Sequence, residues 1–199
     1  MKGKLQMLDY SQDNENTHIS NINHYLQLMK MSYKGAVNEL QGREECQYDY
    51  FNRQSFKNLA RKNFKSINKK DRMPNYNKNR SKYSEGLILH HVWENKFKNL
   101  SYLTSIRNHP DFMYQQKENL VYCNLLEHLI LHGLIAKETH KKLGIGGYKS
   151  IPAQIENLYN KEKSSKLNDQ EKILLSAIGL KHQEYKNVLA LANKMINDC

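Results

Sequence analysis

The chain has 199 residues, of which 39% are hydrophobic and 26% are charged, and its formal net charge is +11. This length allows one compact domain, or a small catalytic core with flanking units. No stretch approaches the ~20 apolar residues of a membrane span, and the polar N-terminus lacks a signal core, so we expect a cytoplasmic protein without a membrane partner.

Helical periodicity dominates the N-terminal part of the chain. Residues 1–18 are polar and irregular, and we expect a loose lead-in there. From Ile19 to Glu45, apolar residues recur every three or four positions, which is typical of an amphipathic helix. Gly35 is a candidate break within it. A second helical pattern covers residues 51–67.

Positive charge is concentrated between Arg53 and Lys82. This segment carries eleven basic residues against one acid, Asp71, so its formal charge is +10. Basic residues four positions apart form one stripe on the predicted helix, and their mutual repulsion would be relieved by a phosphate backbone. We therefore expect contact with nucleic acid, although a solvated loop rich in Lys and Asn is the alternative. The residues expected to bind it are Arg53, Lys57, Arg61, Lys65, Lys69, Lys70 and Arg72.

Two strands and a helix are expected in the central part of the chain. Gly86–Val92 and Asn119–Cys123 are short and apolar enough for buried strands. A helix should follow from Asn124 to Glu138, with Asn124 as its N-cap and Glu127 in a capping box. Because this helix is apolar on most faces, it should be largely buried.

The C-terminal part is expected to be helical again. Gly144–Gly147 is predicted to be a loop, and it is not a phosphate-binding fingerprint because its spacing is wrong and no strand precedes it. Helical patterns return at about 151–160 and 169–197.

The chemistry is suggested by histidines in the central part. His90 and His91 are adjacent, Asn119 lies in the second apolar run, and His128 and His132 are four residues apart. Side chains at that spacing share one face of a helix and can hold one ion. A free histidine has a pKa near 6.5 and is mostly available as a base at neutral pH. These are the groups needed to hydrolyse a phosphodiester bond.

On a strand–loop–strand–helix pattern, this order resembles the HNH (His-Me finger, ββα-metal) endonucleases, and its spacing from Asn119 onwards is similar to that of the DNase colicins. The resemblance covers residues 86–138. It implies that His91 is the general base, that Asn119 orients it, and that the other three histidines bind one divalent metal: Mg, Mn, Ni or Zn. Those ligands would be His90, His128 and His132.

The resemblance has departures. Many members carry an acid where this chain has His90, the usual Pro after the histidine pair is missing, and the insertion before Asn119 is longer than in the colicins. Adjacent strand residues also point to opposite faces. His90 and His91 can therefore serve one site only if the strand ends or bulges at this point.

We expect an α+β, mainly helical protein with a ββα-metal core at 86–138. A helical and basic DNA-contacting region at 1–85 would precede the core, and a helical region at 139–199 would follow it. The leading hypothesis is an endonuclease that cleaves double-stranded DNA, from a bacterium or a phage. A catalytically inactive DNA-binding protein of the same fold and an RNA-cleaving toxin remain alternatives. The oligomeric state is open, and a dimer is compatible with the sequence.

Overall fold

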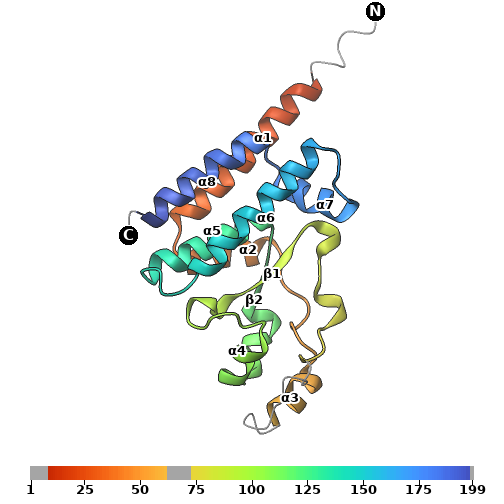
Figure 1. Cartoon of the computed structure of the whole chain (residues 1–199), viewed down its shortest axis with the longest axis vertical. Coiled ribbons are helices and arrows are strands. Elements are labelled where there is room, and N and C mark those ends of the chain that lie inside the picture. Colours follow the sequence, from red (N-terminus) through yellow and green to blue (C-terminus); the bar gives the residue numbers. More distant parts are fainter. Residues whose placement is uncertain (1–8, 62–72, 198–199) are drawn as a thin grey trace, which may run out of the picture.

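A central buried helix, α5 (Leu125–Glu138), organises the molecule (Figure 1). The computed structural model describes residues 9–61 and 73–197, and within these ranges it is mainly helical with one small antiparallel sheet. Leu126, Leu129 and Ile130 of α5 are completely inaccessible to solvent. The expected fold class, α+β and mainly helical, is therefore confirmed.

The other long helices pack around α5 and share its apolar core. Tyr25, Val121 and Ile155, which belong to three different predicted regions of the chain, lie in the same buried cluster. The core is therefore continuous across residues 85 and 138, where region boundaries were expected. In the described part of the chain, no helix is long and apolar enough to cross a membrane. The helices around α5 are α1 (Asp9–Lys30), α2 (Tyr33–Arg43), α6 (Ile145–Lys163), α7 (Asp169–Ile178) and α8 (His182–Asn197).

The N-terminal helical pattern is divided at Ser32. This residue is the N-cap of α2, and its side chain accepts a hydrogen bond from the backbone N–H of Gly35. The predicted break at Gly35 is therefore wrong by three residues, because a serine cap satisfies the free N–H groups of a new helix. The lead-in prediction is also wrong from Asp9 onwards, where α1 begins. The first residues of α1 are polar, so they show no apolar periodicity from which a helix could be predicted.

The two predicted strands form a hairpin that leads into α5. β1 (Ile88–His91) and β2 (Leu120–Cys123) are antiparallel, with His90 opposite Val121 and His91 opposite Leu120. Both strand predictions are confirmed, with shorter bounds.

The start of α5 is fixed by the predicted capping box. The Asn124 side chain accepts from the N–H groups of Leu126 and Glu127, and the Glu127 carboxylate accepts from the N–H of Asn124. Glu127 also binds His24 of α1 and Arg43 of α2. This single buried carboxylate therefore joins the first turn of α5 to both N-terminal helices.

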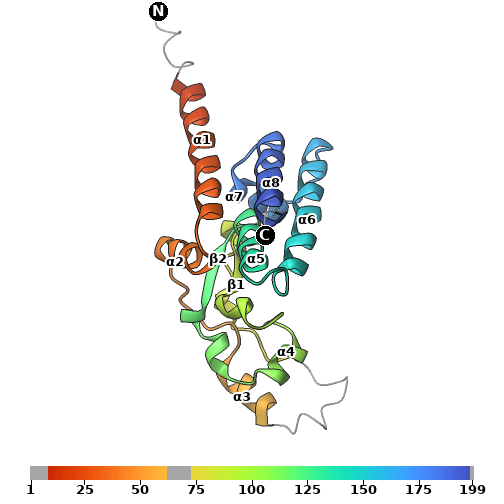
Figure 2. The same ribbon diagram turned by 90° about the vertical axis from the view of Figure 1, so that its left-hand side faces the viewer.

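A smaller lobe lies at the end of the molecule away from α1 (Figure 2). It contains α3 (Arg53–Arg61) and α4 (Leu103–Asn108), whose residues Phe56 and Ile106 share a second small core. The connecting segments contain the 3-10 turns η2 (Lys78–Arg80), η3 (Tyr83–Glu85), η4 (Val92–Asn95), η5 (Phe112–Gln115) and η6 (Lys117–Asn119).

The C-terminal helices are confirmed, with two corrections. The pattern at 169–197 is two helices, α7 and α8, separated at Gly179, which has a left-handed backbone conformation. The loop predicted at Gly144–Gly147 is wrong, because only Gly144 lies outside α6 and the other residues form its first turn.

Candidate metal centre

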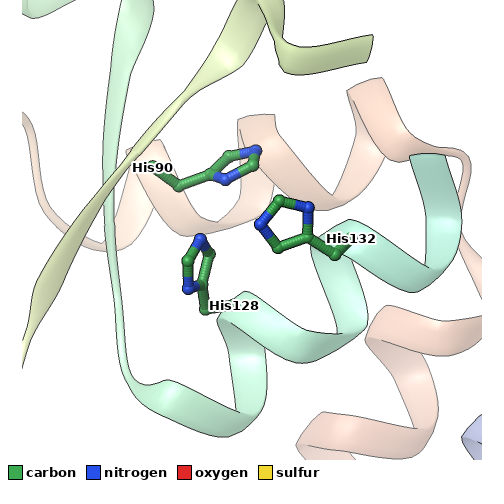
Figure 3. Close-up of side chains that lie close together, drawn as sticks. All are labelled: His90, His128 and His132. Atoms are coloured by element: carbon green, nitrogen blue, oxygen red, sulfur yellow. The ribbon is translucent and has the colours of Figure 1, made fainter. Parts of the chain in front are cut away.

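Three histidine rings meet between β1 and α5. His90 extends from the strand, and His128 and His132 extend toward it from successive turns of the helix (Figure 3). Their ring centroids lie 5.2, 5.2 and 4.6 Å apart. One nitrogen from each ring can be chosen so that all three lie within 4.8 Å of one another. The predicted metal ligands are therefore brought together.

The orientation of His90 is set by Tyr33 of α2. The Tyr33 hydroxyl lies 2.8 Å from Nε2 of His90 and donates its only proton to the carbonyl of Val92, also at 2.8 Å. It must therefore accept from an Nε2–H of His90, which leaves the Nδ1 lone pair free. Nδ1 is buried without a hydrogen-bond partner among the described residues. Histidines that bind metals usually have this arrangement: one ring nitrogen is free for the metal, and the N–H of the other donates to a nearby acceptor.

Burial keeps the three rings neutral. It lowers the pKa of His128 to about 3 and that of His132 to about 4, and it lowers the pKa of His90 well below its usual value. Like-charge repulsion among the rings adds to the shift for His90 and His128. Nδ1 of His132 is a second buried nitrogen without a partner. Neutral imidazoles with free lone pairs suit Zn or Ni, so the residues present fit a divalent transition metal.

Gly147 of α6 makes room for the His132 ring. A Cβ at position 147 would lie 2.5–2.6 Å from three atoms of that ring, a distance that side chains do not tolerate. At the neighbouring Gly146, an added Cβ would meet nothing within 4 Å. Helix α6 therefore forms one wall of the site, and a glycine is required where it passes His132.

His91 faces a different environment from His90. Its Nε2 lies 2.9 Å from Oε1 of Gln115, and its ring lies 4.5 Å from that of Tyr50. Nε2 of Gln115 donates to the carbonyl of Leu100, which fixes which end of the amide faces His91. Because an amide oxygen only accepts, Nε2 of His91 carries the proton and Nδ1 carries the lone pair.

β1 ends directly after the histidine pair, and its two histidines have different neighbours. β1 stops at His91, which is the N-cap of η4. His90 joins the metal trio, and His91 remains close enough for its charge to lower the pKa of both His90 and His128. Burial lowers the pKa of His91 itself to about 4, with the Gln115 hydrogen bond acting in the opposite direction.

Asn119 has a different set of partners from those expected. Its Oδ1 accepts from the indole N–H of Trp93, and its Nδ2 donates to the carbonyl of Met113. The side chain that contacts the His91 imidazole is Gln115. Asn119 therefore binds the turn that carries Gln115. Gln115 was not predicted from the sequence, because no local sequence pattern distinguishes it.

Comparisons with known proteins add no relative. No family model, curated protein or solved structure matches this chain. Its functional interpretation therefore depends on the residues and geometry described above.

The histidine cluster opens into a large cavity. The cavity has a volume of about 720 Å³, and its lining includes His128, His132, Arg80 and Tyr102. It is also lined by Glu94, a largely buried acid that the sequence analysis did not identify. Burial raises the pKa of Glu94 to about 7, against a lowering hydrogen bond from the backbone of Leu100.

The predicted nucleic-acid contacts are only partly described. Arg53 and Lys57 are exposed on α3, and the Arg53 guanidinium lies 4.8 Å from the Phe112 ring centre. Arg61 is the last residue of α3. Lys65, Lys69, Lys70 and Arg72 lie outside the described residues.

Proposed function

We propose that this protein is a metal-dependent endonuclease that hydrolyses DNA, built on a ββα-metal core similar to that of the HNH enzymes. The observation that carries this proposal is the convergence of three neutral histidines from β1 and α5 beside a fourth, His91, whose protonation is fixed by Gln115. One nitrogen of each ring in the trio lies within 4.8 Å of the other two, and the fourth imidazole has its own hydrogen-bond partner.

His91 is the proposed general base. Its Nδ1 carries the lone pair and takes a proton from the attacking water, while Gln115 holds the opposite nitrogen and acts as a positioning residue. General-base catalysis of this kind contributes roughly 10²–10⁴-fold. With a pKa of about 4, His91 is unprotonated at neutral pH.

The proposed ligands of the ion are His90, His128 and His132. The ion would supply Lewis-acid stabilisation of the charge on the scissile phosphate and the leaving oxygen. Tyr33 fixes the tautomer of His90, and Gly147 leaves space for the His132 ring. Two residues outside the trio, Tyr33 and Gly147, therefore support the geometry of the ligands.

The proposed substrate is double-stranded DNA. The chain carries +11, of which +10 lies between Arg53 and Lys82. Arg53 and Lys57 present two of these charges on the exposed side of α3, in the lobe beyond the hairpin (Figure 2). Basic side chains that neutralise phosphates give affinity without sequence preference.

The test is a plasmid-nicking assay with Mg²⁺, Mn²⁺, Ni²⁺ or Zn²⁺. Wild type should nick the plasmid, His91→Ala should lose most of the rate, and His128→Ala should lose it together with metal binding. Equal nicking by wild type and His91→Ala would show that His91 is not the general base. Duplex DNA, single-stranded DNA and structured RNA are compared as substrates, and preferential cleavage of RNA would favour the toxin hypothesis.

One observation favours a second candidate, a DNA-binding protein of the same fold without catalysis. Only 2% of His91 is accessible to solvent, so water and phosphate reach it only if its surroundings move. This candidate predicts salt-sensitive DNA binding by wild type and no cleavage with any of the four metals. Cleavage that depends on His91 excludes it.

A further inference from the structure

We infer that Glu94 is a fourth protein ligand of the proposed metal ion, so that the site is three histidines and one carboxylate. This inference rests on the metal site of the proposed function and extends it to a residue outside the histidine pattern. The carboxylate is brought there by η4, which turns the chain immediately after β1.

The Glu94 carboxylate lies close to one nitrogen of each of two histidines of the trio. Its Oε2 lies 3.8 Å from Nδ1 of His90 and 3.7 Å from Nε2 of His132. The first of these nitrogens is the one that Tyr33 leaves with a free lone pair. Glu94 therefore lies beside two of the three histidines of the trio.

These separations are too long for hydrogen bonds, which join N and O atoms at about 2.7–3.2 Å. They are close to the spacing of atoms that share one metal. With metal–ligand bonds of about 2.0–2.2 Å, two ligands of a tetrahedral ion lie roughly 3.3–3.6 Å apart. The two distances from Glu94 to His90 and His132 exceed this spacing by only a few tenths of an ångström.

The surroundings of Glu94 also call for a cation. Its side chain is only 15% exposed, and its ion-pair contacts are to two histidines of the trio. Among the described residues, no Lys or Arg lies within ion-pair distance of this carboxylate. A buried carboxylate without a positive partner is costly, and a divalent ion would supply that charge.

The carboxylate is already oriented toward the site. The backbone N–H of Leu100 donates to it from the loop that follows η4. Asn99, just before, adopts a left-handed backbone with φ 55°, as a tight turn there requires. A hydrogen bond from outside the shell is the usual support of a metal-binding carboxylate.

A carboxylate ligand has a consequence for metal choice. Oxygen ligands suit Mn²⁺ better than imidazole nitrogens do, whereas Zn²⁺ accepts both. Loss of Glu94 should therefore weaken Mn²⁺ binding more than Zn²⁺ binding. A residue that only held a histidine through a hydrogen bond would weaken both metals alike.

The experiment measures metal binding to the metal-free full-length protein, without any cleavage assay. Calorimetry gives the Kd for Mn²⁺ and Zn²⁺, and visible absorption of bound Co²⁺ reports the ligand set. The variants are Glu94→Gln, Glu94→Asp, which keeps a carboxylate, and Glu39→Gln, which removes a charge from an exposed position on α2. Circular dichroism checks the fold of each.

We expect Glu94→Gln to weaken Mn²⁺ binding by at least ~10-fold, to weaken Zn²⁺ binding less, and to change the Co²⁺ spectrum. Glu94→Asp should fall between Glu94→Gln and wild type, and Glu39→Gln should equal wild type. Wild-type affinity and spectrum in a folded Glu94→Gln would overturn the inference and leave the proposed function standing. If wild type binds none of the three metals, both fall. A protein that binds metal but cleaves no DNA loses only the proposed function.

Discussion

The hydroxyl of Tyr33 lies 2.8 Å from Nε2 of His90, and its proton goes to the carbonyl of Val92. This contact joins α2 to β1 and determines which nitrogen of His90 has a free lone pair. A helix outside the hairpin therefore sets the chemistry of a residue within it. The N-terminal part of the chain therefore contributes a residue, Tyr33, to the candidate metal centre.

Replacement of Tyr33 by Phe should weaken metal binding. The change removes the acceptor that holds the Nε2–H of His90, and loss of such an outer contact typically costs about 10–100-fold in metal affinity. The matched control is Tyr25→Phe, because Tyr25 is also a buried tyrosine whose hydroxyl donates to a backbone carbonyl, that of Ile178. Calorimetric titration with Zn²⁺ measures both. Equal affinities in the two variants would contradict the role of Tyr33.

The sequence predicts the parts of the site whose signals are local. The capping box of Asn124 and Glu127 lies within four residues, and it sets where α5 begins. With that start fixed, His128 and His132 must share one face of the helix. Both short strands are also predicted, because apolar runs bounded by polar residues are visible without knowledge of the fold.

The supporting residues could not be predicted in this way. Tyr33 reaches His90 across 57 positions of the chain, and Gln115 reaches His91 across 24. Both contacts depend on how helices and loops pack, and neither residue belongs to a recognisable pattern. Asn119 illustrates the same limit, since its hydrogen bonds go to Trp93 and Met113.

Replacement of Gln115 by Leu should disturb His91 without removing it. Loss of the amide oxygen frees the ring to adopt either tautomer, so nicking should slow, but by less than the ~10²–10⁴-fold expected for loss of the base. Nitrogen NMR of the imidazole should show a mixed tautomer in place of the Nε2–H form. Gln116→Leu is the control, because this neighbour makes no side-chain cap bond. An unchanged tautomer in Gln115→Leu would refute the assignment.

Replacement of Gly147 by Ala should displace the His132 ring. A methyl group at this position would lie 2.5–2.6 Å from ring atoms, so the ring or α6 must move. We expect weaker Zn²⁺ binding and a lower melting temperature. Gly146→Ala, one position earlier, meets nothing and should be neutral or stabilise the helix by about 0.5–1 kcal/mol. Similar behaviour of the two variants in thermal melts and metal titrations would count against this contact.

The metal-free protein should lose stability as the pH falls below about 6.5. An unfolded histidine titrates near 6.5, whereas burial lowers the pKa of His128 to about 3 and those of His91 and His132 to about 4. Between these values the unfolded chain binds more protons, so the free energy of unfolding falls as the pH is lowered.

Glu94 acts in the opposite direction, because its pKa is raised to about 7 and its contribution to stability is lost as the pH rises toward that value. Three histidines outweigh this one acid. We therefore expect a net loss on the order of a few kcal/mol between pH 7 and pH 5, measured by urea unfolding. His128→Asn should reduce the pH dependence, and a flat profile in wild type would mean that the rings are not buried in neutral form.

Removal of the two described charges on α3 should make DNA binding less dependent on salt. Each phosphate contact contributes about 0.9 to the slope of log K against log salt concentration, so Arg53→Gln with Lys57→Gln should reduce the slope by up to ~1.8. The measurement uses fluorescence anisotropy on a duplex without added metal, so that cleavage cannot interfere. The control carries Lys149→Gln and Lys186→Gln, two exposed lysines on α6 and α8. A control slope reduced by the same amount would show that net charge, and not the α3 surface, sets the affinity.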